Sequence, residues 1–232
     1  MKQLLGEIRR ADEKWHMIGD HEKVAVGLSG GKDSLVLLSA LARYRLIRPF
    51  ELTAVTVKAS REWDVSPLRE LCDQLEVEYI TVEGDLLGTV MRDKNPCALC
   101  ARLRRGMLSR ACAERGIRVL ALGHHREDLA ETLLMNLLEG GRAAALSPVL
   151  KEGREGVRVI RPLLTVPESR LAAAAERLRL PVIKNPCPAD GNTGRRKARE
   201  ALIMLETLYP DAAERLLHAA EQDLLPGREN EG

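Results

Sequence analysis

A short apolar segment followed at once by a glycine-rich turn and a helical run is the feature that most constrains this chain. Residues 23–29, KVAVGLS, form a compact apolar run typical of a buried strand. The turn GLSGGKDS (27–34) then leads into DSLVLLSALARYR, a helix-forming stretch. A strand, a tight turn and a helix in this order are the first half of a β–α–β unit. The segment therefore predicts a parallel sheet.

The rest of the chain repeats this pattern. Helical segments separate further apolar runs, which we expect to be strands at 51–57, 76–82, 117–123 and 156–163. Because these runs are apolar without strict alternation, both faces of the sheet should be buried. The sequence therefore predicts an α/β fold with a doubly wound, mainly parallel five-stranded sheet.

Three regions are expected along the chain. Residues 1–22 should form an N-terminal helix, and residues 23–190 should form the main domain, which carries the cysteines. Residues 191–232 should add two helices, broken at Pro210, that belong to the same structural unit and end in a frayed tail.

The composition narrows the class of protein. A chain of 232 residues with 45% hydrophobic content can bury the core of one large domain, but its charges nearly cancel, at +2. A nucleic-acid surface must therefore come from local clusters. No apolar run approaches the roughly 18 residues of a membrane span, and the charged start does not resemble a signal peptide. Five cysteines, an odd number, do not suggest a secreted disulfide framework, so a cytoplasmic location is expected.

The turn at 27–34 has the chemistry of a phosphate site. Consecutive small residues let backbone N–H groups converge on one anion, and the helix N-terminus adds positive potential. A plain glycine-rich turn would have the same shape, but Lys32 and Ser34 favour phosphate. The loop is not a Walker A motif, because Asp33 stands where that motif needs Ser or Thr.

A second polar segment, GHHREDLAET (123–132), follows the expected fourth strand. In a parallel sheet this edge faces the ligand crevice. Asp128 and Glu131 are three residues apart and so share one helix face, although acids in a first turn are also favoured by the helix dipole alone. Adjacent side chains diverge at a strand end, so we do not expect His124 and His125 to form a metal site by themselves.

Three cysteines stand in organised contexts. CALC places Cys97 and Cys100 one helical turn apart, and Cys187 lies between two prolines far along the chain. Zinc binding, a redox pair, a persulfide-carrying pair and an iron–sulfur cluster are the competing roles, and three thiolates are too few for most structural zinc sites. Cys72 and Cys112 sit within helical patterns and are expected to be packed core residues.

These motifs together carry a resemblance to a known family. SGGKDS (29–34) resembles the PP-loop signature of ATP-pyrophosphatases, which cleave ATP between the α and β phosphates and adenylate a carbonyl oxygen. Segment 123–132 is similar to the GHHxDDxxET motif of PP-loop enzymes that modify tRNA, with Glu127 replacing the usual Asp. With CxxC after a proline and a later lone cysteine, the chain resembles the TtcA-type tRNA 2-thiocytidine synthetases.

The resemblance implies a PP-loop, adenine nucleotide alpha hydrolase-like fold and a set of site residues. ATP is expected to contact Ser29, Gly30, Gly31, Lys32, Asp33, Ser34, Val57, Gly123 and Asp128. Asp33 and Asp128 are the expected Mg²⁺ ligands. A [4Fe–4S] cluster is implied on Cys97, Cys100 and Cys187, with its fourth iron open for the sulfur to be transferred. Catalytic roles are expected for Lys32, Asp33, Asp128 and the three cysteines.

Two basic runs predict contact with RNA, because the guanidinium fork of arginine pairs well with phosphate. One run follows the CxxC and the other follows Cys187; the expected contacts are Arg102, Arg104, Arg105, Arg195, Arg196 and Lys197. Either run alone would be read as a solvated helix face. Trp15 and Trp63 are weak candidates for stacking on bases.

The expected function is therefore an ATP- and [4Fe–4S]-dependent tRNA sulfurtransferase that converts cytidine to 2-thiocytidine, at position 32 by resemblance. Its expected partners are tRNA and a sulfur donor, either a cysteine desulfurase or sulfide. The family precedent is a homodimer, although no feature of the sequence marks an interface. Two alternatives stay open: a cluster-free thiolase that passes a persulfide between cysteines, and a nucleotide-binding module that senses ATP or redox state without chemistry.

Overall fold

The computed structural model describes residues 1–60, 62–84, 96–151, 153–183 and 194–225, with the backbone alone at 96–98 and 194. Its centre is a six-stranded sheet in the order β3-β2-β1-β4-β6-β5. The strands are β1 (Lys23–Gly27), β2 (Glu51–Val57), β3 (Glu78–Val82), β4 (Val119–Ala121), β5 (Val149–Leu150) and β6 (Arg158–Ile160).

The expected fold class is confirmed, with one strand more than expected. Strands β1 to β4 and β6 pair in parallel, whereas β5 pairs with β6 in antiparallel register. The two residues of β5 are too few to show a periodicity in the sequence. The fourth and fifth expected strands are shorter than predicted, because the chain leaves the sheet at Ala121 and Ile160 to form the loops of the site.

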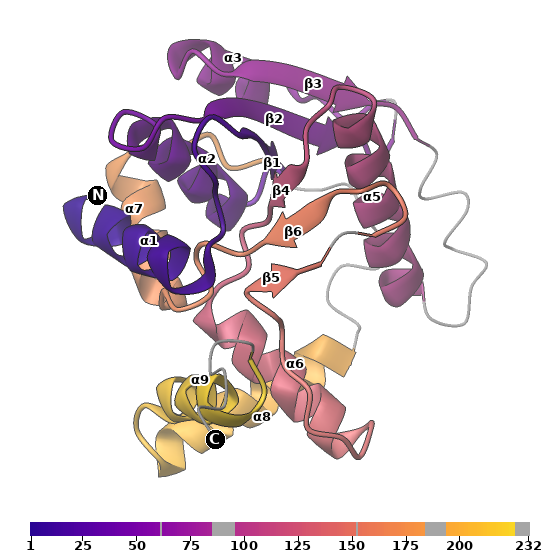
Figure 1. Ribbon diagram of the computed structural model, residues 1–232. Coiled ribbons are helices and arrows are strands. Elements are labelled where there is room, and N and C mark those ends of the chain that lie inside the picture. Colours follow the sequence, from indigo (N-terminus) through magenta and orange to yellow (C-terminus); the bar gives the residue numbers. More distant parts are fainter. Residues whose placement is uncertain (61, 85–95, 152, 184–193, 226–232) are drawn as a thin grey trace, which may run out of the picture.

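Helices cover both faces of the sheet (Figure 1). One apolar cluster packs inward-facing residues of β1 and β2 against α1 (Lys2–Trp15), α2 (Lys32–Tyr44), α3 (Ser66–Gln74) and α7 (Glu168–Arg177). A second cluster, on the opposite face, packs Ala25, Val55 and Leu120 against α5 (Pro96–Ala113). Cys72 and Cys112 are fully buried, one in each cluster, as expected of packed residues.

Helix α1 ends at Trp15, earlier than the expected helix over 1–22. His16 takes a left-handed conformation (φ 47°), which stops the helix. The buried carboxylate of Asp12 then accepts hydrogen bonds from the backbone N–H of Ile18 and the hydroxyl of Tyr44, both at 2.8 Å. This carboxylate anchors the end of α1 to α2 and to the segment that enters β1.

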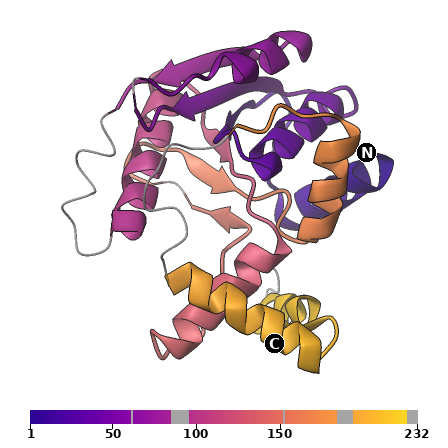
Figure 2. The same cartoon turned by 180° about the vertical axis from the view of Figure 1, so that it is seen from behind.

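The C-terminal helices pack below the sheet on α6 (Arg126–Leu138), which follows β4 (Figures 1 and 2). Helices α8 (Gly194–Leu208) and α9 (Ala212–Asp223) bury Ala198, Leu202 and Ala213 against Ala130 and Leu134 of α6. The break between them falls beside Pro210, where Asp211 has a φ of 66°. Within the described part of the chain, no helix combines the length and the apolar character that a membrane span requires.

The strand order places the site. From β1 the chain moves outward to β2 and β3, and later returns to the other side of β1 with β4 and β6. The loops after β1 and β4 therefore leave the sheet in opposite directions at its carboxyl edge, where α/β proteins bind ligands. Gly123 lets these loops touch: a Cβ there would lie 3.0 Å from the carbonyl carbon of Asp33.

We expect Gly123→Ala to destabilise the fold, because the added methyl would meet the backbone of Asp33 and Ser34. Overpacking of this kind typically costs about 1–3 kcal/mol. The matched control is Gly106→Ala in α5, where nothing lies within 4 Å of an added Cβ and helix propensity predicts a gain of about 0.5–1 kcal/mol. Urea unfolding of both variants tests the contact, and equal midpoints for the two would contradict it.

Candidate functional site: a nucleotide pocket at the edge of the sheet

The loop after β1 forms a compact cradle at the start of α2. Gly30 has a φ of 80°, a left-handed conformation that suits glycine. The hydroxyl of Ser34 donates to the carbonyl of Gly31 at 2.9 Å and accepts from the backbone N–H of Ser29 at 3.2 Å. The loop is thus closed by its own side chains, and Gly31 presents the free N-terminus of α2.

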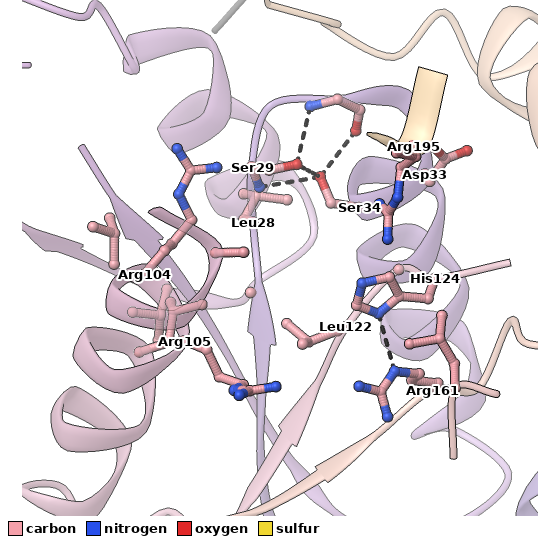
Figure 3. Close-up of a pocket in the computed structure, with 18 of the residues that line it drawn as sticks. Leu28, Ser29, Asp33, Ser34, Arg104, Arg105, Leu122, His124, Arg161 and Arg195 are labelled. Carbon is pink, nitrogen blue, oxygen red and sulfur yellow. Dashed lines mark hydrogen bonds between the residues drawn. The ribbon is translucent and has the colours of Figure 1, made fainter. Parts of the chain in front are cut away.

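A pocket of about 500 Å³ opens in front of this cradle (Figure 3). Of the expected ATP contacts, six line it: Ser29, Gly31, Asp33, Ser34, Val57 and Gly123. Its walls also include apolar side chains such as Leu28, Val55, Leu108 and Leu122. The pocket therefore combines an anion-binding end with an apolar surface that suits a nucleobase.

The three other expected contacts, Gly30, Lys32 and Asp128, lie outside the pocket lining. The ammonium of Lys32 is 2.7 Å from Oε1 of Glu168 and 3.2 Å from Oδ2 of Asp33. Burial acts to lower the pKa of Lys32, but the hydrogen bond to Glu168 and the charge of Asp33 outweigh it and raise that pKa. Lys32 is therefore a firmly protonated cation bound to carboxylates behind the loop.

Asp33 occupies the boundary between the loop and the acidic residues. Burial, opposed by the charge of Lys32, raises the pKa of its carboxyl group. Its Oδ1 atom is buried and finds no hydrogen-bond partner among the residues that the structure describes. A buried carboxylate oxygen without a partner is unfavourable, so a cation or a donor at this position would stabilise it.

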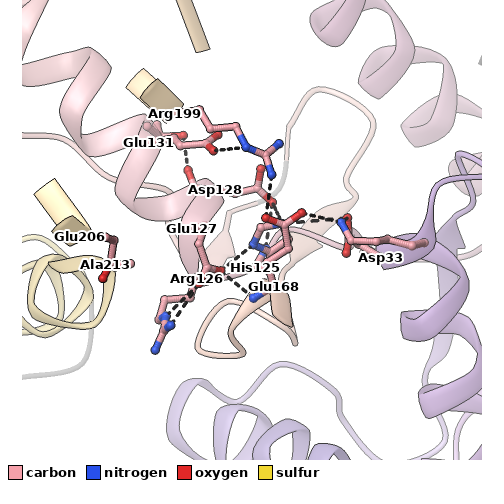
Figure 4. Close-up of polar contacts among 12 residues, drawn as sticks. Asp33, His125, Arg126, Glu127, Asp128, Glu131, Glu168, Arg199, Glu206 and Ala213 are labelled. Carbon is pink, nitrogen blue, oxygen red and sulfur yellow. Dashed lines mark hydrogen bonds and ion pairs between the residues drawn. The ribbon is translucent and has the colours of Figure 1, made fainter. Parts of the chain in front are cut away.

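The first turn of α6 carries a charged cluster around His125 (Figure 4). The imidazole of His125 lies 3.1 Å from Oε2 of Glu127 through Nδ1 and 3.4 Å from Oδ2 of Asp128 through Nε2. Burial opposes protonation, but these carboxylates and Asp33 raise the pKa of His125. Glu127 also accepts the backbone N–H of Glu168 at 2.8 Å, and although burial acts against it, these hydrogen bonds lower its pKa to about 2.

Asp128 serves as a helix cap and as an ion-pair partner. Its Oδ2 accepts the backbone N–H of His125 at 3.0 Å, and its Oδ1 lies 3.5 Å from Arg195 of α8. Glu131, on the same face of α6, is buried and lies 3.9 Å from both Arg195 and Arg199. Asp128 and Glu131 therefore share one face of α6, as predicted, and arginines of α8 neutralise their negative charges.

The two basic runs differ in their surroundings. In α8, Arg195 pairs with Asp128, and Arg196 pairs with Glu200 at 2.9 Å; Lys197 is exposed. In α5, Arg104 and Arg105 line the pocket and Arg102 is exposed. The structure records no ion pair between this second group and any described residue. The α5 arginines are therefore better placed for an external anion.

The cysteines can be placed only in part. Cys100 is a half-buried free cysteine in the first turns of α5, and its neighbour Ala101 lines the pocket. Cys97 lies on the same helix, but its side chain falls outside the described residues, as does the whole of Cys187. Both flanks of the segment that contains Cys187 lie at the site, because Ile183 donates to the carbonyl of Gly30 at 3.0 Å and Arg195 contacts Asp128.

Several residues of the site were not predicted from the sequence, and three of them are informative. Arg161 and Leu146 line the pocket, and Glu168 joins Lys32 to Arg199. Leu146 and Arg161 lie in loops that only the fold brings to this edge, whereas Glu168 is the first residue of α7. The two weak candidates for base stacking, Trp15 and Trp63, are each only 8% exposed, although Trp63 lines the pocket.

Comparison with known proteins assigns this site to a class. Residues 4–206 match a family model described as a PP-loop domain. A tRNA-cytidine(32) 2-sulfurtransferase of Alkalilimnicola ehrlichii is 43% identical over 77% of the chain and 58% of that protein. Another of Dechloromonas aromatica is 34% identical over 97% of the chain and 81% of that protein. The chain belongs to the PP-loop family, and within it to the group that contains the tRNA-cytidine(32) 2-sulfurtransferases.

A solved structure resembles the whole arrangement. The U34-tRNA thiolase NcsA from Methanococcus maripaludis, solved with its [4Fe-4S] cluster, superposes with a TM-score of 0.80. It is 30% identical to this chain, and the match covers 95% of the chain and 77% of that protein. The likeness extends beyond the PP-loop to the C-terminal helices.

We expect Glu127→Gln to reveal the His125–Glu127 pair through the pH dependence of stability. Glu127 has a depressed pKa in the folded protein. The stability that its carboxylate contributes is therefore fully present above the ordinary pKa of 4.5 and disappears as the pH falls towards 2. His125 has a raised pKa, so its contribution is present below 6.5 and disappears as the pH rises through the folded value. The loss in unfolding free energy should therefore peak between about pH 4.5 and 6.5, at about 1.5 kcal/mol or more.

Chemical denaturation across pH 3–9 in the presence of a chelator measures this difference. Glu139→Gln, at an exposed position at the end of the same helix, is the matched control and should show no peak. A difference for Glu127→Gln that keeps growing above pH 8 would contradict the pairing.

Proposed function

We propose that this protein is an ATP-dependent tRNA sulfurtransferase that replaces O2 of a cytidine with sulfur to give 2-thiocytidine, at position 32 as in its named relatives. The observation that carries the proposal is one pocket whose walls come from the PP-loop on one side and from the helix of Cys100 on the other. A nucleotide-activating loop and a sulfur-handling helix thus face the same space.

The PP-loop would hold the pyrophosphate part of ATP. Backbone N–H groups at the start of α2 offer donors, and the helix dipole favours the negative charge. Lys32 would add charge from behind the loop. Attack of cytidine O2 on the α-phosphate would then form a phosphorus–oxygen bond and release pyrophosphate.

Mg²⁺ fits the acidic edge of this site. The unpartnered Oδ1 of Asp33 is a hard oxygen donor of the kind that Mg²⁺ prefers, and Asp128 lies on the neighbouring helix. The ion would be held by Asp33 and Asp128, and when bound it would reduce the repulsion between the phosphates and the attacking group.

The cysteines would hold a [4Fe–4S] cluster, as the sulfur-rich donor set favours. Cys100 fits this role: it is a free, half-buried cysteine, and its neighbour Ala101 lines the pocket. Cys97 and Cys187 would be the other ligands. When bound, such a cluster supplies an iron site without a protein ligand, which is the chemistry needed to deliver inorganic sulfur.

The tRNA would reach the pocket over α5. Arg104 and Arg105 line the pocket, and Arg102 is exposed on the same helix. None of the three has an ion pair to a described residue, so phosphates would supply their counter-charge. The C-terminal run, from Arg195 to Lys197, would add contacts at the other edge. A tRNA substrate implies a cytoplasmic reaction, with sulfide or a cysteine desulfurase as sulfur donor, and a homodimer remains part of the proposal.

The test is a comparison of cysteine variants prepared without oxygen. Cys100→Ser and Cys187→Ser should lose the iron-dependent absorbance and at least about 100-fold of the 2-thiocytidine formed, as for loss of other metal-orienting groups. Pyrophosphate release from ATP with tRNA should change less, because it depends on the PP-loop. Cys112→Ala is the matched control, since that thiol is buried in the core and burial raises its pKa to about 11.

Each alternative gives a distinct result. If protein free of iron thiolates tRNA fully, and Cys100→Ser loses this activity, sulfur is transferred through a cysteine persulfide and not through a cluster. A wild-type protein that binds ATP but neither releases pyrophosphate nor thiolates tRNA would instead be a sensing module. Mass spectrometry of nucleosides from the treated tRNA identifies the modified base.

A further inference from the structure

Two residues on one wall of the pocket, His124 and Arg161, are joined by a hydrogen bond. His124 follows β4 and Arg161 follows β6, the neighbouring strand of the sheet. The Nε–H group of Arg161 donates to Nδ1 of His124 over 3.2 Å, and both residues line the pocket (Figure 3). The imidazole therefore meets the guanidinium on one edge and the pocket on the other.

The direction of this hydrogen bond fixes the state of the imidazole. A guanidinium has only N–H donors, so Nδ1 of His124 must be the acceptor. A neutral imidazole that accepts at Nδ1 carries its proton on Nε2. A protonated imidazolium would instead place an N–H group at Nδ1, where it would repel the Nε–H group of Arg161. His124 is therefore a neutral ring that offers an N–H donor from Nε2.

Arg161 is well suited to hold the ring in this state. Its side chain is 4% exposed, and its guanidinium also donates to the carbonyl of Ser147 at 2.5 Å. It forms no ion pair with any residue in the described part of the chain. Burial and the nearby Arg105 lower the pKa of Arg161 to about 10, which leaves it charged at neutral pH.

The surroundings of His124 agree with a neutral ring. Burial, followed by the charge of Arg161, lowers the pKa of His124 to about 4. The other charged groups around it are Asp128, Arg195 and His125. Only Asp128 favours the protonated ring.

We propose that His124 is a catalytic residue that donates a hydrogen bond from Nε2 to a non-bridging oxygen of the α-phosphate of ATP, and that Arg161 is the positioning residue that fixes its tautomer. The inference rests on the proposed function and adds a donor to it. If the PP-loop holds the pyrophosphate, the next group towards His124 and α5 along the pocket is the α-phosphate.

The bond changes need no proton from His124. Cytidine O2 forms a bond to the α-phosphorus, and the bond to the bridging oxygen breaks with its electron pair leaving on pyrophosphate. In the second step sulfide forms a bond to C2 with its own electron pair, and AMP leaves with the electrons of the C2–O2 bond. A neutral donor can stabilise the growing charge on the α-phosphate oxygens in both steps and return to its starting state.

The first experiment compares three variants for pyrophosphate release and for the KM of ATP. His124→Ala should lower kcat by about 100-fold or more, as the loss of one preorganised donor does elsewhere, with KM changed by less than about 3-fold. His124→Gln, whose amide can place an N–H near the same point, should recover most of the rate. Arg161→Met should fall between these two.

The second experiment reads the tautomer directly by ¹⁵N NMR of the histidine rings in the full-length protein, with His124→Gln assigning the signal. In the wild type, the ring should stay neutral with its proton on Nε2 from pH 5.5 to 8. In Arg161→Met it should show both tautomers and titrate within this range. Arg158→Met, in the strand that Arg161 follows but paired with Glu22, is the matched control and should leave the His124 signal unchanged.

The outcomes separate the two proposals. Normal pyrophosphate release by His124→Ala, or a wild-type ring protonated on Nδ1, overturns the role of His124 while the thiolase activity stands. A wild-type protein that releases no pyrophosphate and makes no 2-thiocytidine overturns the proposed function, and with it the catalytic role. In that case the NMR result still decides whether Arg161 fixes the tautomer.

Discussion

The contact between Gly123 and the first turn of α2 is the constraint on which the site depends. Because glycine has no side chain, the loop after β4 can lie against the backbone of Asp33 and Ser34. This contact brings the two loops of the switch point together and sets the width of the pocket between them. A larger residue would separate the phosphate cradle from the histidines and acids of α6.

A network of charges then ties three helices to this contact. Glu168 at the start of α7 binds Lys32 of α2 at 2.7 Å and Arg199 of α8 at 2.8 Å, and its backbone N–H is held by Glu127 of α6. Exposed ion pairs such as that of Arg199 contribute little to stability, but Lys32, Glu168 and Glu127 are half-buried and share partners, so they act as a unit. The C-terminal helices have their own small apolar core, and this network fixes their position relative to the PP-loop.

The sequence predicted the parts of the site that are local and left out those that the fold assembles. The PP-loop, the acidic turn of α6 and the parallel sheet could be read from it, because each depends on residues close in the chain. Arg161 could not, since it follows a three-residue strand and reaches the pocket only because β6 pairs with β4. The partner of Lys32 was also unpredictable, because Glu168 lies 136 residues further along the chain.

The basic runs show most clearly what the structure adds to the sequence. Both follow cysteines and look alike as strings of arginine and lysine. In α8, Arg195 and Arg199 face Asp128, Glu131 and Glu168, so much of their charge neutralises acids of the protein itself. In α5, the structure records no such acids for Arg102, Arg104 and Arg105 among the described residues. Since a buried or paired cation gains little from a further anion, the electrostatic attraction for a polyanion should come mainly from α5. That helix also carries Cys100, so the strongest attraction for RNA coincides with the wall of the pocket where sulfur transfer is proposed.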